Sequence, residues 1–213
     1  MTAGKKKICI IGAGGHGRET LCAVIDGMDS AQDIRDIACF MVDDEYYDET
    51  TIMGIEVIPS SKFDAALYDV VVAIGDPATR KKIVERLPAD TTYATIIHPS
   101  AIISEWVEIG EGSIISAGVI ITCNIKIGKH VHLNTRTTVS HDCILGDFFT
   151  AALGVSISGN CQLGSGVYLG THAAIKQKIT VTDNVTIGMG GVVVKDIQEA
   201  GVYVGVPVQK LVK

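Results

Sequence analysis

An apolar side chain recurs at every sixth residue across the C-terminal half of the sequence, and the period does not slip. The positions are Ile103, Ile109, Ile115, Ile121, Ile127, Leu133, Val139, Leu145, Ala151, Ile157, Leu163, Leu169, Ile175, Val181, Ile187 and Val193. A weaker apolar column lies four residues later and includes Val107, Val119, Ile125, Val131, Cys143, Val155 and Val167. Three short strands that each turn after six residues close a triangular coil of about 18 residues. The sequence therefore predicts a parallel β-helix between residues 102 and 197.

A single coil of this kind cannot bury its own interior, so several coils must stack at the strand spacing of about 4.8 Å. The repeat is long enough for about five coils. Each branched side chain that points inward stabilises the array by roughly 1.5–3 kcal/mol. We expect the inward columns to hold the stack together.

The N-terminal part has the pattern of a small α/β domain. Residues 8–11 form an apolar strand, and the glycines at 12, 14 and 17 that follow it match G-x-G-x-x-G ahead of an apolar helical stretch. In this context backbone N–H groups and the helix dipole can hold a phosphate. Further strands at 37–42 and 70–74 and a helix at 77–87 predict a small, Rossmann-like parallel sheet. We place the domain boundary after residue 98, giving an α/β domain at 1–98 and a β-helix at 99–213.

The motif alone leaves two ligand classes open. Nicotinamide-dependent oxidoreductases share the glycine fingerprint, but fewer than a hundred residues is short for a dinucleotide domain, and only the β-helix follows it. A nucleoside diphosphate, as in a nucleotide sugar, fits the space better, and Asp43 and Asp44 end the second strand where a ribose or base is bound. The net charge of −6 argues against nucleic acid or an anionic membrane as main partner. With no apolar spanning run in the sequence, we expect a cytoplasmic protein without membrane association.

The repeat also selects a candidate catalytic corner. Val139 is inward, so His141 and Asp142 belong to the next corner, outside the core. Gly159 lies 18 residues beyond His141, one coil up, where its backbone N–H is accessible beside the ring. A histidine oriented by a carboxylate can act as a base near neutral pH, and a nearby N–H can stabilise an oxyanion. This is the arrangement that acyl transfer requires. Cys143 and Cys161 fall on the inward column, so we expect no covalent cysteine mechanism.

Histidines on a β-helix can also bind zinc, as in carbonic anhydrases of this shape. The candidates are His130, His132, His141 and His172, and they lack the H-x4-H pair of such a site. We expect no metal, and we expect His130 and His132 at the surface or at an interface.

Taken in order, these motifs resemble the bacterial sugar acyltransferases related to sialic acid O-acetyltransferase, most closely the nucleotide-amino-sugar N-acetyltransferases. The resemblance rests on Gly12-Ala13-Gly14-Gly15-His16-Gly17, Val42-Asp43-Asp44, Ala73-Ile74-Gly75-Asp76 with Arg80, Ile97-His98-Pro99-Ser100, Asn134 with Val139-Ser140-His141-Asp142, Gly146-Asp147-Phe148, Gly188-Met189-Gly190 and Val204-Gly205-Val206-Pro207. Members of this family are homotrimers of left-handed β-helices that bind acetyl-CoA between neighbouring subunits and the nucleotide on the N-terminal domain.

The resemblance implies a role for individual residues. His141 is the general base, Asp142 its acidic neighbour, and Gly159 the backbone donor near the thioester carbonyl. The residues that contact acetyl-CoA would be Gly159, Gly170, Gly188, Gly190 and Pro207. Those that contact the nucleotide sugar would be Gly14, His16 and Arg18 at the diphosphate and sugar, and Asp43 and Asp44 at the nucleoside. The chain departs from the family at Thr150, where many relatives have a cofactor-contacting histidine, and at Asp76, where asparagine is common.

We therefore predict an acetyl-CoA-dependent N-acetyltransferase that acts on the amino group, at C4, of a nucleotide-linked deoxy-amino sugar in bacterial surface glycan synthesis. Two alternatives stay open: a sialic acid-type sugar O-acetyltransferase, and a non-catalytic trimeric binding protein. The sequence leaves the base of the nucleotide, uracil, guanine or thymine, undecided.

Overall fold

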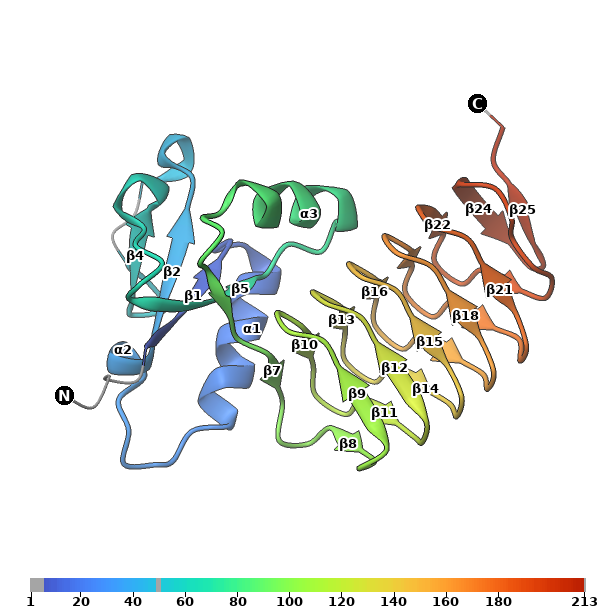
Figure 1. Ribbon diagram of the computed structural model, residues 1–213, viewed down its shortest axis with the longest axis horizontal. Coiled ribbons are helices and arrows are strands. Elements are labelled where there is room, and N and C mark those ends of the chain that lie inside the picture. The colour runs from blue at the N-terminus through green and yellow to red at the C-terminus, as the bar shows by residue number, and fades with distance from the viewer. Residues whose placement is uncertain (1–5, 49–50, 213) are drawn as a thin grey trace.

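The computed structural model describes residues 6–48 and 51–212 and consists of an α/β domain followed by a parallel β-solenoid (Figure 1). The elements of the first domain are β1 (Lys7–Ile11), α1 (Gly15–Asp26), α2 (Ile34–Ile37), β2 (Ala38–Val42), η1 (Asp44–Tyr46), β3 (Thr51–Ile52), β4 (Ile55–Pro59), η2 (Ser60–Lys62), β5 (Tyr68–Val72), α3 (Pro77–Arg86) and β6 (Thr92–Tyr93). Within the described ranges, no helix is both long and apolar enough to cross a membrane.

The six strands form one sheet in the order β3-β4-β2-β1-β5-β6, in which only the β3–β4 pair is antiparallel. Helix α1 packs its buried Leu21 and Val24 on one face of the sheet, and α3 packs Ile83 and Val84 on the other. Strands β2 and β5 lie on opposite sides of β1. The order in which successive strands are added to the sheet therefore reverses at β1, although all three strands are parallel. Ligands bind to open parallel sheets at such reversals, beyond the carboxyl ends of the strands.

The solenoid has three faces of short, stacked parallel strands (Figure 1). The first face contains β7 (Ile96–Ile97), β10 (Ile114–Ile115), β13 (His132–Leu133), β16 (Thr150–Ala151), β19 (Tyr168–Leu169), β22 (Val185–Ile187) and β24 (Gly201–Gly205), with β25 (Val208–Lys210) antiparallel at its end. The second contains β8 (Ile102–Ile103), β11 (Ile120–Ile121), β14 (Thr138–Val139), β17 (Ser156–Ile157), β20 (Ala174–Ile175) and β23 (Val192–Val193). The third contains β9 (Val107–Ile109), β12 (Ile125–Ile127), β15 (Ile144–Leu145), β18 (Gln162–Leu163) and β21 (Thr180–Val181).

The corners between these faces share one backbone conformation. From residue 112 to residue 190, every sixth residue has a positive φ. Edge A, between the second and third faces, carries Asn124, Asp142, Asn160 and Lys178 at these positions; edge B, between the third and first, carries Gly112, His130, Phe148, Gly166 and Asn184; edge C, between the first and second, carries Gly118, Arg136, Gly154, His172 and Gly190. The φ of +60° at Asp142 is therefore a property of the repeat and is not strain peculiar to that residue.

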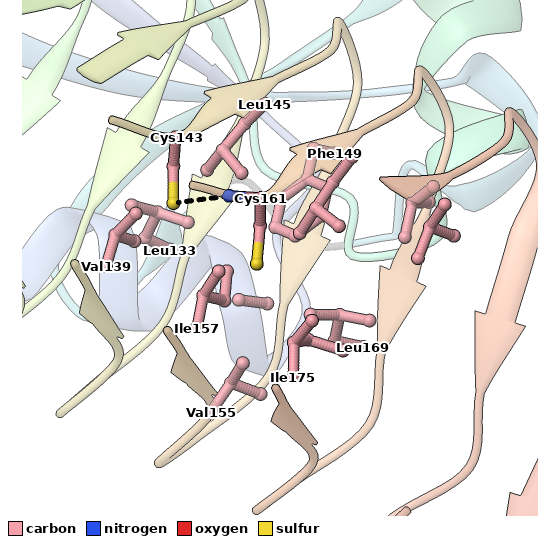
Figure 2. Close-up of a cluster of buried hydrophobic side chains, with 14 of the residues drawn as sticks. Leu133, Val139, Cys143, Leu145, Phe149, Val155, Ile157, Cys161, Leu169 and Ile175 are labelled. Carbon is pink, nitrogen blue, oxygen red and sulfur yellow. Dashed lines mark hydrogen bonds between the residues drawn. The ribbon is translucent and has the colours of Figure 1, made fainter. Parts of the chain in front are cut away.

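The predicted inward columns form the solenoid core. The six-residue series is buried from Ile115 to Val193, and only Ile103 and Ile109, in the first coil, are half-buried. Figure 2 shows Cys143 and Cys161 stacked within this core, where the backbone N–H of Cys161 donates to the Cys143 sulfur at 3.5 Å. Both thiols are fully buried, which confirms their predicted inward position.

The N-terminal part of the first face, from β7 to β16, packs against the α/β domain. Its outward side chains Ile96, Ile114, His132 and Thr150 stack in register, and all are buried because the α/β domain covers them. The division after residue 98 stays a prediction, and strand β7, which ends before it, already pairs with β10. His130, like His132, is buried at the interface between the two domains and not at an outer surface.

Candidate active site

His141 and Asp142 lie on edge A, in the turn that follows β14, and form a contact pair. His141 Nδ1 is 2.7 Å from Asp142 Oδ2, and the two side chains are 55% and 46% exposed. The amide of Asn124, one coil away, donates to the other carboxylate oxygen of Asp142 at 3.3 Å. Hydrogen bonds from His141 and then from Asn124 hold the Asp142 pKa below its ordinary value. The carboxylate thus fixes the imidazole proton on Nδ1 and leaves Nε2 as the basic nitrogen.

Gly159 lies directly beside the imidazole, as the coil period predicted. A Cβ placed on Gly159 would be 2.6 Å from His141 Cε1 and 2.7 Å from Nε2. Only glycine leaves room for the ring in this position. Within residues 6–48 and 51–212, the amide N–H of Gly159 donates to no backbone or side-chain acceptor, and Gly159 itself is buried beside the ring. The imidazole of His141 and the backbone of Gly159 therefore lie side by side on adjacent coils.

Asn124 was missed in the sequence analysis, although the signal that found Gly159 also finds it. One step of 18 residues back from Asp142 arrives at Asn124. Both residues occupy the same corner position of edge A, with φ of 55° and 60°. Stepping the coil period in both directions from a candidate base would have identified the whole group.

A pocket of about 340 Å³ opens at the carboxyl ends of β1, β2 and β5. Its lining includes Ile11, Gly12, Ala13, Gly14, Met41, Val42, Asp43, Tyr46, Ile74, Thr79, Ile83 and Arg86. The connection from β1 into α1 requires two glycines. Gly12 in the loop has a φ of +99°, and a Cβ on Gly17, in the first turn of α1, would collide with the Gly12 carbonyl. Most of the wall is apolar, and Arg86 forms an ion pair with Asp43. An apolar slot with a polar rim and a glycine loop fits a nucleoside diphosphate.

Of the five residues expected to contact the nucleotide sugar, two line this pocket and three do not. Gly14 and Asp43 line the pocket. Asp44 does not line it; its carboxylate accepts hydrogen bonds from the Ser60 hydroxyl at 3.1 Å and the Ser61 N–H at 3.0 Å. His16 turns toward the solenoid, with Nε2 3.1 Å from His132 Nδ1, and Arg18 is exposed on α1. Arg86 was missed in the sequence, and its signal is the helical spacing of Thr79, Ile83 and Arg86 along one side of α3.

Three of the four glycines expected at acetyl-CoA lie on a different edge from His141. Gly170, Gly188 and Gly190 belong to edge C, whereas His141 and Gly159 belong to edge A. Gly170 also has a packing role, because a Cβ there would be 2.6 Å from the Met189 backbone nitrogen in the next coil. Gly190 has open space around it. Pro207 lines a groove of about 320 Å³ near the end of the solenoid.

A buried arginine joins the two domains on the side of edge B. Arg80 of α3 is completely buried. Its guanidinium donates to the carbonyl oxygens of His130 (3.0 Å), Ile74 (2.5 Å), Gly75 (3.2 Å), Phe148 (2.8 Å) and Phe149 (3.3 Å) and to the Thr150 hydroxyl (2.9 Å). Burial lowers the pKa of Arg80 to about 9, so it stays charged at neutral pH. Thr150, the position at which the family resemblance led us to note a departure, is part of the domain interface.

The neighbouring histidines are kept neutral. Arg80 Nη1 lies 3.2 Å from His132 Nδ1, and because arginine can only donate, this nitrogen accepts and the His132 proton is on Nε2. Burial lowers the pKa of His132 well below its ordinary value and that of His130 to about 4. Across the described residues, no group of three or more His, Cys, Asp or Glu side chains could hold a metal ion.

Comparison with known proteins places this architecture in a family. Residues 7–87 match the family described as PglD N-terminal domain. The chain is 32% identical over 200 residues to GDP-perosamine N-acetyltransferase of Escherichia coli O157:H7, covering 92% of this chain and 81% of that protein. The acetyltransferase domain of PglB from Neisseria gonorrhoeae FA1090, solved with acetyl coenzyme A, superposes with a TM-score of 0.88 at 30% identity, covering 98% and 100% of the two chains. PerB from Caulobacter crescentus, solved with CoA and GDP-perosamine, gives 0.86 at 27% identity, covering 96% and 97%. The chain therefore belongs to the nucleotide-amino-sugar N-acetyltransferases with a left-handed parallel β-helix.

Proposed function

We propose that this protein transfers the acetyl group of acetyl-CoA to the C4 amino group of a nucleotide-linked deoxy-amino sugar, with His141 as general base. The observation that carries the proposal is the geometry at edge A. The His141 ring is held by Asp142 at 2.7 Å and lies against Gly159, with its basic nitrogen directed away from the carboxylate. The relatives named above carry N-acetyltransferase in their names or were solved with CoA ligands, which supports this reaction and donor.

The reaction needs three things from these residues. His141 Nε2 accepts a proton from the amino group as the amine nitrogen bonds to the thioester carbonyl carbon. The N–H of Gly159 donates to the carbonyl oxygen as negative charge develops on it. Asp142 orients the imidazole and stabilises its protonated form. When the carbon–sulfur bond breaks, the proton on His141 is available to the departing thiolate. The proton taken from the amine therefore leaves with the CoA thiol, and no other reactant is needed.

The separation of edges A and C supports a homotrimer. His141 and Gly159 lie on edge A, and Gly170, Gly188 and Gly190 on edge C of the same solenoid. One CoA molecule contacts both sets when edge A of one subunit faces edge C of the next. We propose that acetyl-CoA binds in this groove, with Pro207 at its far end.

The nucleotide would occupy the 340 Å³ pocket of the α/β domain. Gly14 would contact the diphosphate at the start of α1, and Asp43 would contact the nucleoside, as the pocket lining supports. His16, Arg18 and Asp44 lie outside this lining. Arg18 and His16, on the first turns of α1, would face the sugar rather than the base, and Asp44 would act by holding the Ser60–Ser61 turn beside Asp43.

The test is the release of free CoA thiol from acetyl-CoA with a panel of UDP-, GDP- and dTDP-linked 4-amino sugars. Free sialic acid serves as the comparison acceptor, and the His141→Ala variant is the control. We expect turnover with one nucleotide amino sugar, and that acceptor identifies the base. Turnover with free sialic acid alone would instead assign an O-acetyltransferase. No thiol release with any acceptor, despite acetyl-CoA binding, would indicate a non-catalytic binding protein.

A further inference from the structure

We infer that Arg80 is a positioning residue for acetyl transfer, which fixes the nucleotide pocket of the α/β domain onto the coil of the solenoid that carries His141. The inference rests on the function proposed above. Arg80 is not itself one of the residues that line the pocket and does not lie on edge A; it acts through the backbone carbonyls that it binds, including that of Ile74 in the pocket wall.

On the solenoid, Arg80 bridges two successive turns of edge B. Its Nε donates to the His130 carbonyl, and its Nη2 donates to the Phe148 carbonyl one coil later. These residues have φ of 55° and 57°, the corner conformation of the repeat. The 18 residues between the two carbonyls form a single coil, and His141 and Asp142 belong to it. One guanidinium therefore holds both ends of the coil that carries the base.

On the α/β domain, Arg80 holds the wall of the nucleotide pocket. Its Nη1 donates to the carbonyls of Ile74 and Gly75, which follow β5, and the Ile74 side chain lines the pocket. Helix α3 places Thr79 and Ile83 in the same pocket. Thr150 closes the link, since its hydroxyl accepts from Arg80 at 2.9 Å and donates to the Gly75 carbonyl at 3.0 Å.

The chemistry of the contact suits a rigid joint. A guanidinium presents five N–H donors in a fixed plane, and here they meet carbonyls from both domains in a fully buried site. Lysine cannot reproduce this fork with its single ammonium group. A reaction between two separately bound substrates is sensitive to such a joint, because a displacement of about 1 Å can cost about 10²-fold in rate.

The test compares Arg80→Lys with two controls: Lys82→Met, an exposed residue on the same helix, and Ile55→Ala, a buried core position on the α1 side of the sheet. The measurements are kcat on the active nucleotide sugar, dissociation constants for acetyl-CoA and for UDP, GDP or dTDP as matches that sugar, and the melting temperature. For Arg80→Lys we expect kcat to fall about 10- to 100-fold, with both dissociation constants within about threefold of wild type. Ile55→Ala should lower the melting temperature and leave kcat per folded molecule unchanged, and Lys82→Met should change neither.

Wild-type kcat in Arg80→Lys would overturn the inference, and so would a loss of kcat matched by Ile55→Ala at an equal loss of melting temperature. If Arg80→Lys does not fold, the Thr150→Val variant tests the inference instead. Valine has nearly the volume of threonine but lacks the hydroxyl that binds Arg80 and the Gly75 carbonyl. We expect a two- to fivefold loss of kcat in that variant, and unchanged kcat would count against the inference. If the wild-type protein is inactive with every acceptor in the panel, the proposed function is contradicted. A failure of the proposed function can therefore be distinguished from a failure of the inference about Arg80.

Discussion

Edge A and edge B of the solenoid carry histidines in the same repeat but in opposite surroundings. His141 on edge A is 55% exposed and is bonded to a carboxylate. His130 on edge B is 3% exposed, stacks on Phe148 with ring centroids 5.1 Å apart, and lies beneath the α/β domain next to the Arg80 cation. The backbone is the same in both corners. What covers each corner therefore decides its chemistry. The open edge keeps the imidazole that we propose as the general base, and the covered edge holds neutral rings at the interface between the two domains.

The largest expected effect lies on the open edge. Replacing His141 with alanine should lower kcat about 10²- to 10⁴-fold, because the proton of the attacking amine loses its acceptor. The unfolding free energy should change by less than about 0.5 kcal/mol, since more than half of the side chain is exposed. Steady-state kinetics and a denaturant titration measure the two. Lys126→Ala, an exposed change on the third face, is the matched control, and full activity in His141→Ala would refute the assigned base.

The second expected effect tests the fit of the ring against the next coil. Gly159→Ala places a Cβ about where the ring now lies, 2.6 Å from His141 Cε1. The ring must move, so we expect kcat to fall about 10²-fold. In the His141→Ala background the same glycine change should cost much less, because no ring remains to displace. Equal losses in the two backgrounds would show that Gly159 acts without His141.

The covered edge should respond to pH instead. The His130 pKa is lowered by burial from 6.5 to about 4, so between these pH values the unfolded chain binds more protons than the folded chain. The stabilisation is present above pH 6.5 and is lost as the pH falls toward 4. From pH 7 to pH 5, His130 alone should lower the unfolding free energy by about 2 kcal/mol, and His132 should add to the loss. Urea titrations at the two pH values measure this.

A matched pair separates the two edges in that experiment. His130→Asn keeps a residue that tolerates positive φ and should reduce the loss between pH 7 and pH 5. Asn160→Gly, at the matching corner position of the open edge A, should leave the loss at its wild-type value, because neither residue titrates and glycine tolerates the positive φ. If the wild type and both variants lose the same unfolding free energy between pH 7 and pH 5, the buried histidines do not control the pH dependence.

The sequence predicted the open edge well and the covered edge poorly, for a physical reason. The six-residue period determines which side chains point inward and which residues stack 18 apart. It therefore predicted the corner position of His141, the stacking of Gly159 beside it and the burial of Cys143. It carries no information about a second domain packed on the outside. His132 and Thr150 occupy outward positions of the repeat, and only the structure shows that α1 and α3 cover them. Arg80 appeared in the sequence as one matching residue, with no indication that it is buried.

The smallest expected effect concerns the carboxylate that orients the base. Asp142 has asparagines at the same corner position in the coils on either side, Asn124 and Asn160, with φ of 55° and 58°. Asp142→Asn is therefore compatible with the backbone and removes only the charge. We expect kcat to fall about tenfold, because an amide still orients the ring but no longer stabilises its protonated form. Asn124→Gly, which removes one hydrogen bond to the carboxylate and is compatible with the positive φ, should lower kcat about two- to threefold. Since both side chains are exposed, melting temperatures should stay near wild type, and a kcat loss in Asp142→Asn as large as that of His141→Ala would mean that the carboxylate takes part in the proton transfer itself.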